Sequence, residues 1–295
     1  MSKLKFSIVV PSYNQASFLR ATLQSLLDQN DPDLEILACD GGSTDGSVDI
    51  LQEYSARIQW TSRRDFGQTH AINQGLRRAS GDIVAYLNSD DVYYPGCLER
   101  VRAHFAAHPE CLFLYGDAHH LHEDGSVMEP YYTEPWNYDR LKEICFLCQP
   151  AVFWRADALE RFGYFDDTLN YAMDYDYWLR VGCEVPFHYL RGEFLAGSRI
   201  HDDGKTLSQR VQVHREILRV VMRHSEPGPS WVRWLRHLTH YRTVQDTAKV
   251  VQGKSYSLSQ PEIFVRNMLA YSVEFGVVLD AATLRELVAM LGGSS

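Results

Sequence analysis

The segment Asp82–Asp91, which reads DIVAYLNSDD, constrains the fold more than any other part of this chain. Its apolar run from Ile83 to Leu87 has the length and composition of a buried strand. The run ends at two adjacent carboxylates, Asp90 and Asp91, and α/β proteins bind ligands beyond the carboxyl ends of their strands. One or two carboxylates together with substrate phosphates suit a hard cation such as Mg²⁺ or Mn²⁺. The segment predicts a central strand that ends at a metal and nucleotide diphosphate site, and an exposed acidic turn is the alternative.

Strand and helix patterns alternate in front of this segment. We expect strands at residues 6–10, 34–39 and 58–61, and helices at 17–27, 48–54 and 69–79. Ser17 is the expected N-cap of the first helix. Successive strand–helix units of this kind connect by right-handed crossovers. The predicted fold class is therefore α/β, with a mixed, mostly parallel sheet flanked by helices.

The character of the chain changes near residue 205. Residues 205–295 carry 12 Lys and Arg against 7 Asp and Glu, although the whole chain has a formal net charge of -9. Helical spacing recurs at 211–221, 231–238, 263–278 and 281–291. We expect a catalytic domain over residues 1–204 and a helical extension over 205–295. That extension packs on the body, contacts a second copy of the chain, or lies on a membrane surface.

Several function classes are disfavoured. An acidic body argues against nucleic-acid binding. No GxGxxG sequence follows the first strand and no Walker A sequence occurs, which argues against a nicotinamide oxidoreductase and a P-loop NTPase. The six cysteines are scattered, and no signal peptide or membrane-spanning run is evident. We expect a cytoplasmic protein, at the inner face of the cytoplasmic membrane if the extension binds lipid.

Three expected strands end in polar loops that contain PSYN, DGGSTDGS and NSDD. The carboxyl ends of parallel strands share one sheet edge, so these loops converge. Small residues let backbone N–H groups approach a phosphate closely. Tyr13 offers a face for stacking a base, and Asp40 offers a carboxylate to a base N–H or a ribose hydroxyl. Each loop taken alone is equally typical of an ordinary structural turn.

Four segments occur in an order and spacing that resemble the family 2 glycosyltransferases, which are inverting enzymes with the GT-A fold. They are Val9–Asn14, Asp40–Ser47, Gly67–Gly75 and Asn88–Asp91. The resemblance implies a nucleotide-sugar donor, a Mg²⁺ or Mn²⁺ ion and inversion at the anomeric carbon. Many members have an aspartate where this chain has Asn88, but the two following carboxylates remain, so we expect metal binding to be retained.

The resemblance implies roles for particular residues. The donor would contact Pro11, Tyr13, Asn14, Asp40, Gly41, Arg64, Gly67, Gln68, Asn73 and Asp90. Arg63 is the alternative to Arg64. Asp91 would ligate the metal directly, and Asp90 would contact the ribose or the metal. His201, in the sequence Arg-Ile-His, would be a third metal ligand or a diphosphate contact.

The stretch from Met173 to Arg180 resembles the family's Glu-Asp-x-Asp-x-x-Leu-x-x-Arg sequence, which supplies the catalytic base. Met173 stands where the family has the glutamate, so of that Glu-Asp pair only Asp174 corresponds. The resemblance assigns the base to Asp174, with Asp176 as the fallback. From the residues alone, Asp174 is equally well explained as an acidic residue in the first turn of a helix.

The predicted reaction moves a sugar from a UDP-, dTDP- or GDP-sugar to a hydroxyl of a glycan or lipid-linked saccharide, in surface polysaccharide synthesis. Transfer to a polyprenyl phosphate is one alternative. A non-catalytic nucleotide-sugar-binding protein of the same fold is another.

Overall fold

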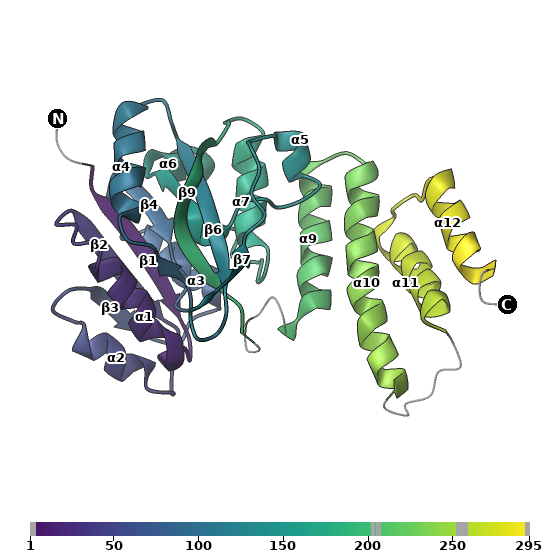
Figure 1. Cartoon of the computed structure of the whole chain (residues 1–295), viewed down its shortest axis with the longest axis horizontal. Helices are drawn as coiled ribbons and strands as arrows, with labels where there is room; N and C mark the ends of the chain where they lie inside the picture. Colours follow the sequence, from purple (N-terminus) through teal and green to yellow (C-terminus); the bar gives the residue numbers. More distant parts are fainter. Residues whose placement is uncertain (1–3, 202–203, 205–207, 252–258, 293–295) are drawn as a thin grey trace. The chain divides into compact units, whose positions relative to one another are not determined.

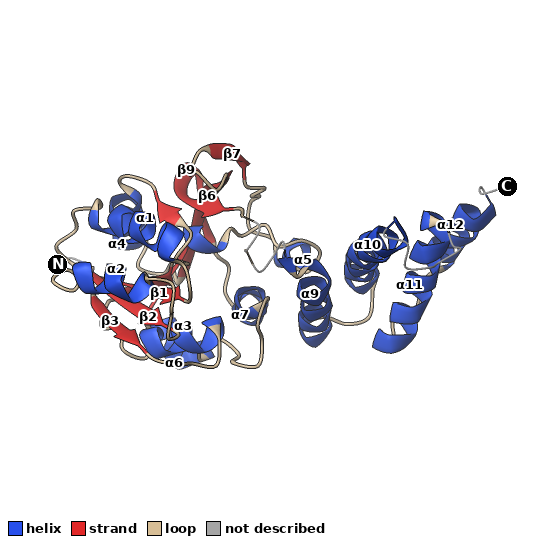
Figure 2. Cartoon of the chain, turned by 90° about the horizontal axis from the view of Figure 1, so that it is seen from below, coloured by secondary structure: helices blue, strands red, loops and turns tan. Residues whose placement is uncertain are grey.

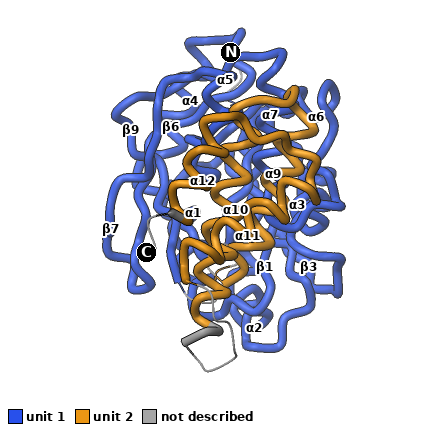
Figure 3. Tube along the Cα trace, turned by 90° about the vertical axis from the view of Figure 1, so that its right-hand side faces the viewer, with its two compact units in different colours: residues 1–202 blue, residues 203–295 orange. Residues whose placement is uncertain are grey.

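The computed structural model describes residues 4–201, 204, 208–251 and 259–292. The chain divides into two compact units, residues 1–202 and 203–295 (Figure 3). From the sequence, we expected this boundary two residues later, after residue 204.

The first unit alternates strands and helices along most of its length (Figure 1). Its first half contains β1 Phe6–Ser12, α1 Ala16–Leu27, β2 Leu34–Asp40, α2 Ser47–Glu53, β3 Gln59–Ser62, α3 Gln68–Leu76, β4 Ile83–Tyr86, β5 Val92–Tyr93 and α4 Cys97–Ala107. Its second half contains β6 Phe113–Leu121, β7 Val127–Pro130, α5 Tyr138–Leu141, the 3₁₀ turn η1 Gln149–Ala151, β8 Val152–Arg155, α6 Asp157–Phe162, α7 Met173–Gly182 and β9 His188–Arg199.

In the described part of the chain, nine strands form one sheet in the order β3-β2-β1-β4-β8-β6-β9-β5, and β7 pairs with β6. The pairings among β3, β2, β1 and β4 are parallel, as the alternating pattern predicted. The second half is more antiparallel than expected, because β8 pairs antiparallel with both β4 and β6, and β5 with β9. A mixed sheet therefore results, in which β6 and β9 form a further parallel pair.

Helices cover both faces of this sheet. Figure 2 shows α1, α2 and α4 on one side of the strands and α3 and α6 on the other. The contact between α3 and β1 depends on Gly75, because a Cβ at this position would lie 2.4 Å from Cγ1 of Val9. Close packing fixes the height of α3 above the sheet, and with it the position of the loop that precedes the helix.

The start of α1 differs from the prediction that Ser17 is its N-cap. The N-cap is Gln15, and its side chain makes no capping hydrogen bond. The backbone N–H of Ala16 instead donates to Oδ2 of Asp45 at 2.9 Å. A carboxylate from a distant loop thus satisfies a free amide of the first turn, which a local sequence pattern could not reveal.

A cluster of buried aromatic rings joins β6, β8 and α7. The rings of Trp154 and Trp178 are 5.7 Å apart, and Phe165 lies 4.8 Å from Tyr177. Aromatic pairs at such distances add to the stabilisation that comes from burying their area. The cluster anchors α7 to the sheet and so fixes where its N-terminus lies.

The second unit contains α9 Arg210–His224, α10 Pro229–Val251, α11 Gln260–Phe275 and α12 Ala281–Gly292. Helix α10 packs against α9 and α11, and α12 packs against α11. Trp234, Leu235 and Leu238 are buried, so much of the aromatic and apolar side of α10 is used for packing. In the described residues, no helix combines the length and the apolar character that crossing a bilayer requires.

Substituting Gly75 by alanine tests the close contact between α3 and β1. Alanine is the better helix former by about 1 kcal/mol, so helix propensity alone predicts a rise in stability. We expect a fall of about 1–3 kcal/mol instead, because the new methyl group collides with Val9. Chemical denaturation measures the change, with Arg78→Ala at the exposed end of the same segment as a control. A stabilised Gly75→Ala protein would contradict this packing.

Candidate active site

The register of the parallel strands brings the predicted loops to one edge of the sheet. Ser12 lies opposite Asp40, and Asp40 lies opposite Ser62. The strand β4 ends before this edge, because its last residue, Tyr86, lies opposite Val9 in the middle of β1. The segments after β1, β2, β3 and β4 therefore begin side by side, and the acidic end of β4 is the neighbour of the β1 loop.

The β1 and β2 loops are joined by hydrogen bonds. The backbone N–H of Asn14 donates to Oγ of Ser43 at 2.8 Å, and the N–H of Thr44 donates to Oδ1 of Asn14 at 2.9 Å. Asn14 has a φ of 52°, a left-handed conformation that asparagine tolerates better than most residues. Next to it, Tyr13 is 62% exposed. Asn14 thus shapes the loop, and Tyr13 is free to contact a planar ligand.

Asp40 is buried, and its carboxylate is engaged by its own loop. Oδ2 accepts hydrogen bonds from the N–H groups of Gly42 and Ser43 and from the hydroxyl of Ser62, at 3.0, 2.9 and 2.6 Å. The hydroxyl of Ser43 donates to Oδ1. A Cβ on Gly41 would come within 3.0 Å of Oδ2 of Asp65, so the carboxylate of Asp65 packs closely against this glycine. The carboxylate of Asp40 organises the loop that a ligand would meet.

The segment before α3 carries the predicted arginines. The backbone N–H of Arg63 donates to the carbonyl of Asp40 at 3.0 Å, and its guanidinium donates to Gln74. Arg64 is exposed. The N–H of Gly67 donates to Oδ1 of Asp65 at 2.8 Å, just before the first residue of α3. Both arginines are thus exposed, and the guanidinium of Arg63 is the one that is hydrogen-bonded to Gln74.

Asp91 is only 3% exposed at the end of the central strand. Its Oδ1 accepts a hydrogen bond from the backbone N–H of Arg199 at 2.9 Å, and its Oδ2 accepts one from the amide of Asn88 at 3.3 Å. Burial, and then the neighbouring charge of Asp90, raises the pKa of Asp91 well above its ordinary value. A nearby cation would offset this cost, so the environment of Asp91 favours a positive ligand.

The end of β9 closes over the two carboxylates. The guanidinium of Arg199 donates through Nε to the carbonyl of Asp90 at 2.9 Å and also donates to the carbonyl of Glu123 at 2.6 Å. His201 is buried, with its Nε2 3.0 Å from Oδ2 of Asp90 and its ring 4.6 Å from that of Phe18. A carboxylate oxygen and an imidazole nitrogen of predicted site residues therefore lie side by side.

Gln149 is a residue of this site that sequence reasoning missed. Its Nε2 donates to the carbonyl of Tyr86 at 2.8 Å, and its Oε1 accepts from the amide of Asn88 at 3.2 Å. The Oδ1 of Asn88 in turn accepts from Gln68 at 2.7 Å. Gln68, which was predicted to contact the nucleotide sugar, is thus connected through Asn88 to the pair Asp90 and Asp91. The sequence signal was a single polar side chain in the apolar run 146–153.

Asn73 requires a correction. Its side chain is 0% exposed, and its Nδ2 donates to the carbonyl of Phe165 at 2.9 Å and to Oδ1 of Asp167 at 2.8 Å. Its Oδ1 accepts from the N–H of Phe165 at 3.1 Å. No surface is left for a donor molecule, so Asn73 is a structural residue that attaches the 165–167 loop to α3.

The candidate bases Asp174 and Asp176 both lie in the first turn of α7 but differ in environment. Asp176 is 2% exposed and forms an ion pair with Arg180, in which Nε and Oδ2 are 3.8 Å apart. Arg180 also donates to the carbonyl of Tyr164 at 2.8 Å, which ties α7 to the preceding loop. Asp174 is half-buried. Asp176 therefore has a structural task, and Asp174 is the accessible carboxylate.

The charges of Asp91, the candidate metal ligand, and of Asp174, the candidate base, both act on two buried groups. Burial, and then the charges of Asp174 and Asp91, raises the pKa of Tyr86 well above its ordinary value. Burial, followed by Asp91, Cys145 and Asp174, does the same to the thiol of Cys148. Asp91 and Asp174 are 83 positions apart in the sequence, yet both act on the same part of the core. The fold brings these two carboxylates into one region.

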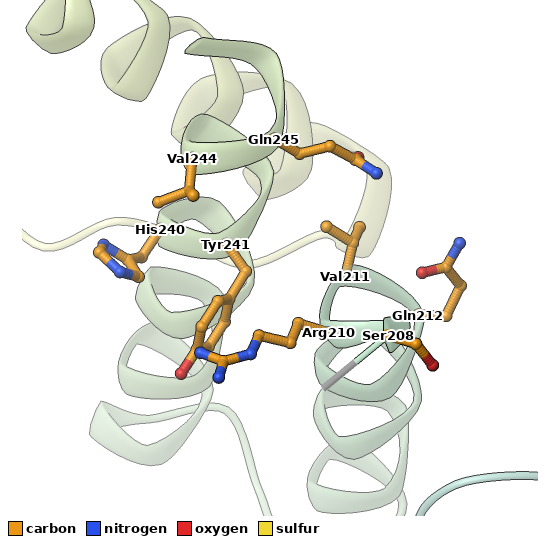
Figure 4. A pocket seen from close by; sticks show the side chains of 8 residues that line it. All are labelled: Ser208, Arg210, Val211, Gln212, His240, Tyr241, Val244 and Gln245. Carbon is orange, nitrogen blue, oxygen red and sulfur yellow. The ribbon is translucent and has the colours of Figure 1, made fainter. Parts of the chain in front are cut away.

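A separate hollow lies in the helical unit between α9 and α10 (Figure 4). Its lining includes the guanidinium of Arg210, which lies 5.1 Å from the centre of the Tyr241 ring, and the side chains of Val211, His240 and Val244. It contains none of the residues predicted to form the active site.

The chain was compared with known proteins. The model of glycosyl transferase family 2 matches residues 7–165, more than half of the chain. Among curated relatives, the chondroitin synthase of Escherichia coli is 27% identical over 214 residues, which are 71% of this chain and 31% of that protein. TuaG of Bacillus subtilis, a glycosyltransferase assigned to teichuronic acid biosynthesis, is 34% identical over 156 residues, 50% of this chain and 62% of that protein. The chain spans 31% to 64% of the length of the curated relatives it matches.

Solved structures show the same fold. TarS of S. aureus, in complex with UDP-GlcNAc, has a TM-score of 0.61 and 19% identity, covering 90% of this chain and 82% of that one. The mannosyltransferase PcManGT from Pyrobaculum calidifontis, in complex with GDP-Man and Mn²⁺, has a TM-score of 0.59 and 17% identity, covering 99% and 81%. These likenesses confirm the GT-A architecture. Together with the family match, they show that the chain belongs to glycosyl transferase family 2.

Proposed function

We propose that this protein is an inverting, metal-dependent glycosyltransferase. It moves one sugar from a nucleotide diphosphate sugar to a hydroxyl of a glycan or lipid-linked saccharide. The observation that carries the proposal is the buried carboxylate of Asp91 at the end of the central strand, next to Asp90, whose Oδ2 lies 3.0 Å from Nε2 of His201. A carboxylate pair for the diphosphate and a separate carboxylate for the acceptor are what such a reaction needs.

The donor occupies the edge where the β1, β2 and β4 loops meet. The ring of Tyr13 stacks on the base, and the backbone around Pro11 and Gly41 allows the nucleotide to approach closely. Arg64 approaches the nucleotide from the loop before α3. The solved relatives with UDP-GlcNAc and with GDP-Man support a nucleotide-sugar donor, which we propose to be a UDP-, dTDP- or GDP-sugar.

A divalent cation fits the residues present. Asp90 and His201 offer an oxygen and a nitrogen 3.0 Å apart, and burial disfavours the ionised form of Asp91 unless a positive charge is near. Carboxylate oxygens suit Mg²⁺ and Mn²⁺, and an imidazole suits Mn²⁺ better than Mg²⁺. Asp90, Asp91 and His201 would hold the ion. When bound, it neutralises the negative charge that develops on the departing nucleoside diphosphate.

Asp174 activates the acceptor. A sugar hydroxyl is a poor nucleophile at neutral pH, and a positioned carboxylate that takes its proton contributes roughly 10²–10⁴-fold in rate. The hydroxyl oxygen forms the new bond to the anomeric carbon as the bond to the diphosphate oxygen breaks, and the proton moves to Asp174. Attack from the face opposite the leaving group inverts the anomeric centre. The hydrogen bonds of Asn73 hold the loop that leads into α7 and so support the position of Asp174.

Surface polysaccharide synthesis is the proposed setting. The names of the chondroitin synthase and teichuronic acid relatives support a glycan acceptor. Transfer to a polyprenyl phosphate is the second acceptor that we retain, and a non-catalytic nucleotide-sugar-binding protein is the competing function. Turnover of a nucleotide sugar distinguishes the enzyme from the binding protein.

Replacing Asp174 by asparagine tests the base. The amide cannot take a proton, so we expect turnover to fall by roughly 10²-fold or more while donor affinity is unchanged. Release of nucleoside diphosphate and calorimetric donor titration measure the two quantities. Asp176→Asn is the matched control, because it makes the same change two residues away at a structural carboxylate; we expect lower stability but near-normal turnover per folded molecule. Near-normal turnover of Asp174→Asn would eliminate Asp174 as the base.

The substitution Asp91→Asn tests the cation site. The pKa of Asp91 is higher in the folded than in the unfolded chain, so its ionisation destabilises the metal-free fold as pH rises between the two values. At neutral pH in EDTA, we expect Asp91→Asn to melt at a higher temperature than the native protein. It should also lose the Mn²⁺-dependent binding of UDP or GDP in calorimetry.

Asp82→Asn at the opposite end of the same strand is the control for charge, and should retain Mn²⁺-dependent binding. Asp91→Asn protein that binds the nucleotide with unchanged metal dependence would refute the assigned role.

We propose that α11 and α12 provide contact with a second copy of the chain or with a membrane surface. Exposed apolar side chains gather on these helices and the segment between them: Leu269, Val273, Val278, Leu284, Val288 and Leu291. Exposed apolar groups of this kind are typical of interaction surfaces.

The double substitution Val273→Glu and Val288→Glu should lower either the native mass or the binding to anionic liposomes. Exposed Val127 in β7 supplies the control substitution Val127→Glu. An unaltered mass together with unaltered liposome binding would contradict this role of the helices.

A further inference from the structure

Histidine and cysteine side chains gather at the end of α4, outside the proposed active site. His104 lies in the last turn of α4 and His108 directly after it. Cys111 precedes β6, and His188 is the first residue of β9. These residues come from three separate parts of the sequence, so no local spacing marks them as a group.

The cluster lies at the edge of the sheet opposite the donor loops. Phe113 at the start of β6 lies opposite Trp154, which in turn lies opposite Val84 near the start of β4. Leu114 lies opposite His188. Asp90 and Asp91 follow the far end of β4, so the cluster has no place in donor binding.

The distances are close to those of a metal site. Nε2 of His104 is 3.0 Å from Nδ1 of His188, and one ligand atom each from His104, Cys111 and His188 lie within 4.8 Å of one another. Tetrahedral zinc with Zn–N and Zn–S bonds of about 2.0–2.3 Å separates its ligand atoms by about 3.3–3.6 Å. Small side-chain rotations would therefore bring these three atoms around one ion.

The contacts around the cluster define what metal binding would change. The thiol of Cys111 donates to the carbonyl of Phe113 at 3.3 Å, and a metal–sulfur bond would replace this hydrogen bond. Arg155 donates to the carbonyls of Phe105 and Cys111, at 2.8 and 2.9 Å, and so fixes the backbone on both sides of the site.

A second group of ligand atoms overlaps the first. His108, Glu110 and His188 also lie within 4.8 Å of one another, but Glu110 is 66% exposed and already pairs with His108 at 3.2 Å. Zinc prefers thiolate and imidazole to an exposed carboxylate. The buried thiol therefore favours the inner group.

We propose that His104, Cys111 and His188 bind one divalent transition-metal ion of the zinc type, with water in the fourth position. Binding forms a metal–sulfur bond, and the thiol proton is released to solvent. The ion joins the end of α4 to the starts of β6 and β9, and it stabilises the fold without taking part in sugar transfer. Because the site lies at the opposite end of the sheet from Asp91, this proposal is independent of the proposed function.

Cobalt titration of the full chain, after removal of bound metal with EDTA, tests the site. We expect one Co²⁺ ion to produce thiolate-to-cobalt charge-transfer absorption and tetrahedral d–d bands. Both signals should disappear when Zn²⁺ displaces the cobalt. The oxygen-rich donor site would produce no thiolate band. Cys111→Ser should abolish the charge-transfer band and weaken binding by more than about 100-fold, the upper loss that an outer-shell partner causes.

Two controls separate the alternatives. Cys183→Ser removes an exposed thiol and His108→Ala removes the outer group, and both should leave the charge-transfer band intact. X-ray absorption of the zinc-loaded native protein needs no variant, and should show one sulfur and two imidazole ligands. Failure to find a thiolate band in the native protein, or its persistence in Cys111→Ser, would overturn the proposal. A zinc shell without sulfur would overturn it as well.

Discussion

The hydrogen bond from the backbone N–H of Arg199 to the carboxylate of Asp91 joins residues 108 positions apart in the chain. It is reinforced by the bond from the Arg199 guanidinium to the carbonyl of Asp90. Without this closure by β9, the buried carboxylate of Asp91 and the half-buried carboxylate of Asp90 would repel each other with few partners. The closure also brings His201 to Asp90, so the same contact completes the proposed cation site. Burial of Asp91 carries a cost in the metal-free fold, which is common where function takes precedence over stability.

The other half of the site depends on the loop that leads into α7. Asn73 and Thr69 of α3 hydrogen-bond to this loop, at Phe165 and Leu169 respectively. The aromatic cluster around Trp178 holds the helix itself against the sheet. Donor loops and candidate base are therefore parts of one packed framework, in which α3 contacts both. A change in the packing of α3 should therefore alter both the donor loops and the position of the candidate base.

The sequence predicted the elements that obey local rules. Apolar runs marked the parallel strands, and the ends of those strands marked Tyr13, Asp40, Asp90 and Asp91, because strand periodicity and loop chemistry are local properties. The tertiary contacts could not be predicted from the sequence. The burial of Asn73, the Gln149–Asn88–Gln68 connection and the pairing of Asp176 with Arg180 each depend on residues distant in the sequence. The antiparallel placement of β8 is of the same kind, since it follows from pairing partners and not from the strand pattern.

A crystal structure of the protein with Mn²⁺ and UDP or GDP would test the proposed cation site directly. We expect one anomalous manganese peak beside Asp90, Asp91 and His201, bridged to the diphosphate, with the base against Tyr13 and Asp174 facing the open side of the site. A manganese ion bound elsewhere, or a diphosphate bound away from the end of β4, would refute this site.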